Sequence, residues 1–112
     1  MLVYRVLHKR TKYGPYCHSE RDGIRYIMNR QHSDSCNHPI LHNFSISRRR
    51  SGFESKAQLK QWFSGYIEDL HKLGYIVNIY QVAEKHTQAD GYQVLFDRSK
   101  AKLVETKELI SL

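Results

Sequence analysis

The chain of 112 residues contains only two cysteines and two prolines. Two cysteines form at most one disulfide bond, so the sequence excludes a small secreted fold built on a disulfide framework. No apolar run approaches the roughly 20 residues that a membrane-spanning helix needs. The first ten residues also lack the basic, apolar and small-residue regions of a signal peptide. We therefore expect one domain over residues 1–112, located in the cytoplasm, with free thiols and no membrane association.

Acidic residues are also scarce. Eleven Asp and Glu stand against 18 Lys and Arg, which gives a net charge of +7 with neutral histidine. Such an excess attracts polyanions, namely nucleic acid, acidic protein surfaces or phosphate-bearing ligands. Eight Tyr, four Phe and one Trp supply enough apolar material for a folded core, so the composition is not that of a disordered chain.

Hydrophobic periodicity predicts one long helix in the second half of the chain. From Leu59 to Leu73 the apolar residues recur every three or four positions, which gives a wide apolar stripe. Ser55 has the capping-box spacing to Gln58, and Gly74 stands where the glycine that ends a helix is expected. The sequence leaves open whether Gly65 splits this helix into two shorter ones.

The remaining apolar patterns predict strands, of which the stretch 75–83 is apolar on both faces, as a central strand is. The stretch 101–109 alternates, as an edge strand does. Together with the helix, these patterns predict an α+β fold in which a small mixed or antiparallel sheet packs against one long amphipathic helix. The four predicted strands are 2–9, 75–83, 92–96 and 101–109.

The first half of the chain is harder to assign. Residues 20–30 could form a short helix, although Gly23 weakens that interpretation. The stretch 31–52 is polar and is predicted to be a loop, with a brief extended piece at 44–47.

Most of the potential metal ligands lie in this polar region. Thiolates and imidazoles are the preferred ligands of zinc, and a cysteine and two histidines follow one another between residues 36 and 42. The other half of the site would have to be the adjacent pair Cys17-His18, whereas structural zinc sites separate paired ligands by about two to four residues. A polar loop without metal is therefore the preferred interpretation. The alternative is a small zinc-binding module that binds nucleic acid, with the candidate ligands Cys17, Cys36, His38 and His42.

Three consecutive arginines form the densest positive charge and stand just before the predicted helix. Guanidinium groups bind phosphate or carboxylate through two parallel hydrogen bonds, and a helix N-terminus adds positive potential. Nearby aromatic rings would provide stacking faces for a partner. The alternative for the same stretch is a solvated, flexible loop. The candidate binding residues are Arg48, Arg49, Arg50, Tyr13, Tyr16 and Phe53.

Several of these stretches occur together in one group of proteins. The motifs are YRVLHKRTKYGPY, the dipeptide HP at 38–39, GFESKAQLKQWF and the closing QVLF. This set resembles small accessory proteins carried by bacteriophages and prophages, whose motifs have no assigned chemistry. The resemblance implies a non-enzymatic protein that modulates or inhibits a host system, for example a defence nuclease complex such as a CRISPR effector. Its partner would be a host protein, a nucleoprotein complex or a nucleic acid, bound in the host cytoplasm by a monomer or weak dimer.

The chain is also similar, in a second way, to ADP-ribosyltransferase-like domains, which implies an NAD-dependent enzyme that modifies a host protein. In those domains the first strand bears an arginine or histidine, matched here by Arg5 or His8. A later strand carries a catalytic glutamate, but this chain has Gln93 there. A neutral amide cannot act as a base or stabilise a cationic reaction centre by its charge. We therefore prefer the binding protein and keep the transferase as the alternative.

Overall fold

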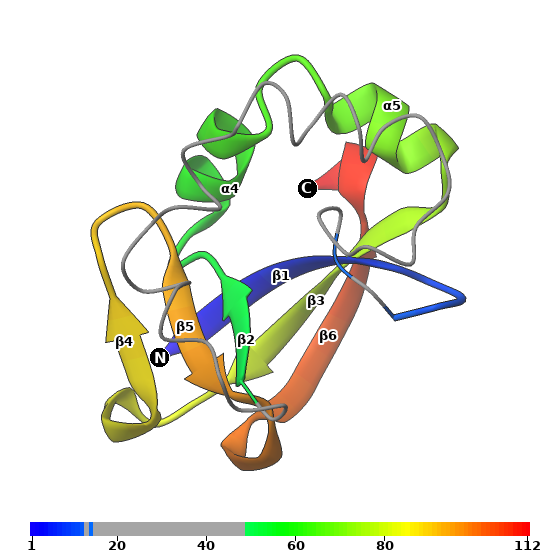
Figure 1. The fold of residues 1–112 in the computed structure, drawn as a ribbon. Helices are drawn as coiled ribbons and strands as arrows, with labels where there is room; N and C mark the ends of the chain where they lie inside the picture. The colour runs from blue at the N-terminus through cyan, green and yellow to red at the C-terminus, as the bar shows by residue number, and fades with distance from the viewer. Residues whose placement is uncertain (13, 15–48) are drawn as a thin grey trace.

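The computed structural model describes residues 1–12, 14 and 49–112. In this part the chain is mostly β-structure, with two antiparallel three-stranded sheets (Figure 1). The first sheet contains β1 (Leu2–His8), β3 (Tyr75–Gln81) and β6 (Lys102–Glu108), and β3 lies in the middle. The second sheet contains β2 (Arg49–Gly52), β4 (Thr87–Ala89) and β5 (Val94–Asp97), and β5 lies in the middle.

Two short helices and three single turns of 3₁₀ helix complete the described part. Both helices lie on the same side of the β1–β3–β6 sheet, above it in the view of Figure 1. None of the helices in the described residues is long and apolar enough to cross a membrane. The helices are α4 (Lys56–Trp62) and α5 (Ile67–Lys72), and the 3₁₀ turns are η1 (Glu84–His86), η2 (Arg98–Lys100) and η3 (Leu109–Ser111).

The prediction of an α+β fold with one long amphipathic helix is wrong. The chain leaves α4 at Phe63, and Gly65 adopts a φ of +88°, a conformation that glycine takes without steric cost. The apolar stripe therefore continues in α5 after a change of direction, and both short helices bury it. The predicted ends are confirmed, since Ser55 Oγ accepts a hydrogen bond from the Gln58 amide at 3.1 Å and Gly74 has a φ of +95°.

The four predicted strands all exist, with ends that differ by one to two residues. The sequence missed β2 and β4, and the predicted loop is wrong at residues 49–52, which form β2. The sequence of β2, RRSG, is polar and ends in glycine, while β4 has only three residues, so neither shows the apolar pattern of a strand. The predicted helix at 20–30 and the extended piece at 44–47 lie outside the described residues.

The first sheet separates two hydrophobic clusters, because successive side chains of a strand point to opposite faces. On one face Val77 and Ile79 pack with Leu59, Phe63 and other residues of the helices. On the other face the ring of Tyr80 packs with residues of β1 and β5. The second cluster comprises Val3, Tyr80, Val82, Val94 and Phe96.

The two sheets are joined where the end of β2 meets β1. Tyr4 and Phe53 form an isolated antiparallel bridge in which each amide donates to the other carbonyl at 2.8 Å. Gly52 precedes this bridge and is in close contact with β1. A Cβ atom added to Gly52 would lie 2.6 Å from Val3 Cγ1 and 2.9 Å from the Tyr4 carbonyl oxygen. Only glycine lets the two backbones approach this closely.

We therefore expect Gly52→Ala to lower the free energy of unfolding by about 1–3 kcal/mol, the usual cost of overpacking a close contact. Urea unfolding followed by circular dichroism measures this change. Gly14→Ala is the matched control, because its added Cβ would lie 3.4 Å from its nearest neighbour, Arg5 Nη2, which is a van der Waals distance and not a clash. Equal stability of the two variants would contradict the proposed role of Gly52.

Candidate functional site

Strand register brings basic residues from two distant segments to one end of the molecule. Arg49 is the register partner of Asp97, so β2 begins where β5 ends. After β5 the chain forms η2 and enters β6 at Lys102. The start of β2, the turn η2 and the start of β6 lie close together in Figure 1. We call this group the basic end; it consists of Arg50, Arg98, Lys100 and Lys102.

The hairpin between β5 and β6 holds its cations in a defined geometry. Asp97 Oδ1 accepts hydrogen bonds from the Ser99 amide at 3.0 Å and from its hydroxyl at 2.6 Å, which caps η2. The Arg98 guanidinium carbon lies 4.6 Å from the centroid of the Tyr80 ring, a cation–π contact. Arg98 Nη1 also donates to the Ala101 carbonyl at 3.3 Å. Arg98 is thus fixed against the core, while Lys100 and Lys102 are exposed to solvent.

The predicted arginine triplet is only partly described. Arg49 and Arg50 belong to β2, and Arg50 is half-buried; Arg48 lies outside the described residues. Several residues separate them from α4, whose N-terminus is capped by Ser55. The structure thus places Arg49 and Arg50 beside η2 and β5 in a sheet, and not at the positive end of a helix.

The predicted aromatic anchors are placed differently from one another. Phe53 is 4% exposed and packs edge-on against Phe63, with ring centroids 5.7 Å apart. Its ring is therefore a core side chain. Tyr13 and Tyr16 lie outside the described residues.

The candidate zinc ligands also lie outside the part of the chain that the structure describes. They are Cys17, Cys36, His38 and His42. Within residues 1–12, 14 and 49–112, no three His, Cys, Asp or Glu side chains gather as potential ligands.

The residues of the transferase alternative have local structural contacts. His8 Nε2 lies 2.9 Å from the Leu73 carbonyl oxygen, and His8 Nδ1 accepts from the Arg10 amide at 3.1 Å. Both ring nitrogens are thus engaged by backbone groups, with Nε2 as the donor. Arg5 Nη1 donates to the Ser51 carbonyl at 2.8 Å and, three positions from His8 on β1, projects from the opposite face. The side chain of Gln93 is buried immediately before β5, a strand of the other sheet.

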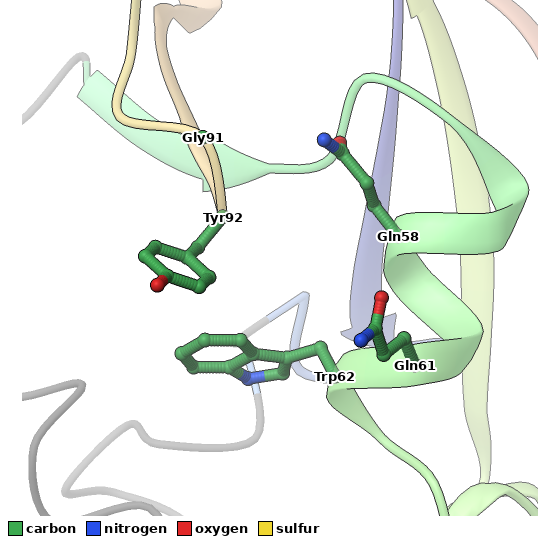
Figure 2. A pocket seen from close by; sticks show the side chains of 5 residues that line it. All are labelled: Gln58, Gln61, Trp62, Gly91 and Tyr92. Carbon is green, nitrogen blue, oxygen red and sulfur yellow. The ribbon is translucent and has the colours of Figure 1, made fainter.

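A groove that sequence reasoning missed lies between α4 and the turn before β5. Its volume is about 370 Å³, and its lining residues are Gln58, Gln61, Trp62, Gly91 and Tyr92. Figure 2 shows the Tyr92 and Trp62 rings bordering one space, with the two glutamine side chains reaching toward it from α4.

Local contacts support both rings of the groove. The Trp62 indole packs against the buried ring of Phe53, with ring centroids 6.1 Å apart, so a core residue supports it. Asp90 Oδ1 accepts hydrogen bonds from the Tyr92 and Gln93 amides, both at 2.7 Å, and Gly91 has a φ of +92°. This turn presents Tyr92 with 63% of its surface exposed. The Asp-Gly pair before Tyr92 was the available sequence signal, because it is typical of a turn.

The described residues thus define a class, a small mostly β protein with a basic end and a separate aromatic groove. Residues 1–110 match the family model described as Bacteriophage T4 Y00F protein, and the chain belongs to that family. The predicted origin in a bacteriophage is thereby confirmed. Comparisons with curated proteins and with solved structures found no match. The resemblance to ADP-ribosyltransferases stays a prediction.

We expect His8→Ala to destabilise the fold by about 1–3 kcal/mol, because it removes a buried side chain and leaves partly buried backbone groups without their hydrogen-bond partner. Thermal or urea unfolding measures the loss. His86→Ala is the control, since His86 lies in η1 and is partly exposed. A fully stable His8→Ala protein would show that the imidazole contributes nothing to the fold and would reopen its assignment to a nicotinamide site.

Proposed function

We propose that this phage protein is a non-enzymatic binding protein that modulates a host system by attaching to a negatively charged macromolecule. The basic end is the proposed contact surface. The observation that carries the proposal is the register of β2 on β5, in which Arg50 pairs with Phe96, two residues before Arg98 in the hairpin that also carries Lys100 and Lys102.

The electrostatics of the basic end favour such a partner. Paired strands lie about 4.8 Å apart, and η2 directly follows β5, so the cations of β2 and η2 act on the same region at distances comparable to or shorter than the Debye length of about 10 Å at 0.1 M salt. The net charge of +7 adds long-range attraction that accelerates encounter with a polyanion. Because the sheet and Tyr80 hold part of these cations in place, binding orders fewer side chains than a flexible loop would.

A host defence complex is the partner class that fits a protein of phage origin. A nuclease complex with its nucleic acid presents rows of phosphates. Acidic patches on protein surfaces present carboxylates. Arginine and lysine side chains bind both groups through charge-assisted hydrogen bonds. The proposal therefore covers an acidic protein surface and a nucleic acid, which the experiment below separates.

The protein would act as a monomer or weak dimer. The strand β6 is an edge strand, and its register against β3 shifts so that Leu103 opposes Tyr80 while Glu105 opposes Ile79. This bulge, together with the lysines of β6, disfavours pairing with the edge of a second copy.

We expect the double variant Lys100→Glu/Lys102→Glu to lose at least about tenfold of its capture of host partners, because two exposed cations become anions. Tagged protein is incubated with host lysate, with and without nuclease treatment, and bound material is quantified. The control is Lys60→Glu/Lys85→Glu, which also changes exposed lysines and lowers the net charge from +7 by four, to +3.

The two lysate arms separate the possible partners. Capture that survives nuclease indicates an acidic protein, and capture that nuclease abolishes indicates nucleic acid. Full capture by the basic-end variant would refute the proposal. Equal losses in both double variants would refute it as well, since net charge alone would then explain binding.

A further inference from the structure

We infer that the groove between Trp62 and Tyr92 holds an unpaired nucleobase, which makes single-stranded nucleic acid the partner. The inference rests on the proposed function, because the phosphates of that strand are assigned to the basic end. The inference adds a second site, the groove, which binds the neutral planar ring of a base.

The shape of the groove suits such a ring. Trp62 and Tyr92 offer aromatic faces from α4 and from the turn before β5, and Gly91 contributes no side chain that would fill the space (Figure 2). Tyr92 is 63% exposed to solvent, and Phe53 packs against the Trp62 indole. Unpaired bases are commonly bound by stacking on aromatic side chains of this kind.

The polar groups of the groove are amides and not charges. Each glutamine side chain carries one acceptor oxygen and a donor NH₂ group, which matches the mixed donors and acceptors on the edges of bases. Gln58 Oε1 accepts a hydrogen bond from the Glu54 amide at 3.0 Å, so this contact turns the NH₂ group of Gln58 toward other partners. Gln61 follows Gln58 three positions later in α4, and its side chain is exposed. A neutral donor set of this type favours a base over a phosphate.

The strand β5 connects the groove to the basic end. Tyr92 precedes β5 and Arg98 follows it, a separation of six residues. At about 3.3 Å per residue, the two sites lie up to about 20 Å apart along the strand. A single strand of several nucleotides is long enough to place one base in the groove and its neighbouring phosphates at the basic end, within the range of about 4–16 nucleotides that small binding domains cover.

Fluorescence tests this inference directly, because Trp62 is the only tryptophan in the chain and reports on the groove. The full chain is titrated with a single-stranded oligonucleotide of about twelve nucleotides. Matched probes are an abasic strand with the same number of phosphates and a duplex of the same sequence. We expect the base-containing single strand to quench Trp62 and to bind at least about tenfold more tightly than the abasic strand.

Variants locate the effect. Tyr92→Ala and Gln61→Ala change exposed side chains, so both are expected to fold. They should bind the base-containing strand about tenfold more weakly and the abasic strand unchanged. The control Ile110→Ala removes another exposed apolar side chain, 54% exposed in η3, and should leave both affinities unchanged.

Three outcomes would overturn the inference. Equal affinity for the base-containing and abasic strands, or for the single strand and the duplex, would exclude the groove as a base-binding site. The basic end would then remain as the binding site. Quenching by a proline-rich peptide and not by the oligonucleotide would assign the groove to a protein ligand. If no oligonucleotide binds while lysate capture survives nuclease, the proposed function stands and its partner is an acidic protein.

Discussion

The close approach of β2 to β1 at Gly52 determines how the two sheets of this protein are arranged. The bridge between Tyr4 and Phe53 is short and involves only two backbone hydrogen bonds, yet it fixes the end of β2 against β1. Because β2 pairs with β5, it also sets the position of both ends of β5. The basic end lies at one of these ends and Tyr92 at the other. A backbone contact within the core thus positions two surface features that have no residue in common.

Tyr80 connects the interior of the first sheet to the basic end. Its hydroxyl accepts a hydrogen bond from Asn78 Nδ2 at 3.0 Å, and Asn78 Oδ1 in turn accepts from Thr106 Oγ1 at 2.8 Å. With its polar atom satisfied, the ring can stay buried and present a face to Arg98. A guanidinium held on an aromatic face keeps its charge while its motion is restricted. The polar contacts of β3 and β6 therefore contribute to the geometry of a surface charge several residues away.

The sequence predicted those elements whose signal is local. Apolar patterns identified four strands, and Ser55 and Gly74 marked the outer limits of the helical region. The long helix was wrong because 3.6-residue periodicity can continue across a turn, and the periodicity alone does not show the positive φ of Gly65. The strand β2 was missed because its pairing with β5, and not its own composition, makes it a strand. Register between distant segments is a tertiary property, so neither the basic end nor the groove could be assembled from sequence spacing.

The basic end and the aromatic groove would bind a ligand through different forces, namely charge at the first and ring stacking at the second. Cations at the basic end attract any polyanion, and their effect weakens as salt screens the charges. A neutral groove with two aromatic rings contributes contacts that salt screens little and that depend on the shape of the ligand. Charge alone would bring the protein to duplex DNA, RNA and acidic proteins alike. The proposed ring-binding site at the far end of β5 would favour the one polyanion whose bases are unpaired. Selectivity would then come from the fixed spacing that β5 imposes between the two sites.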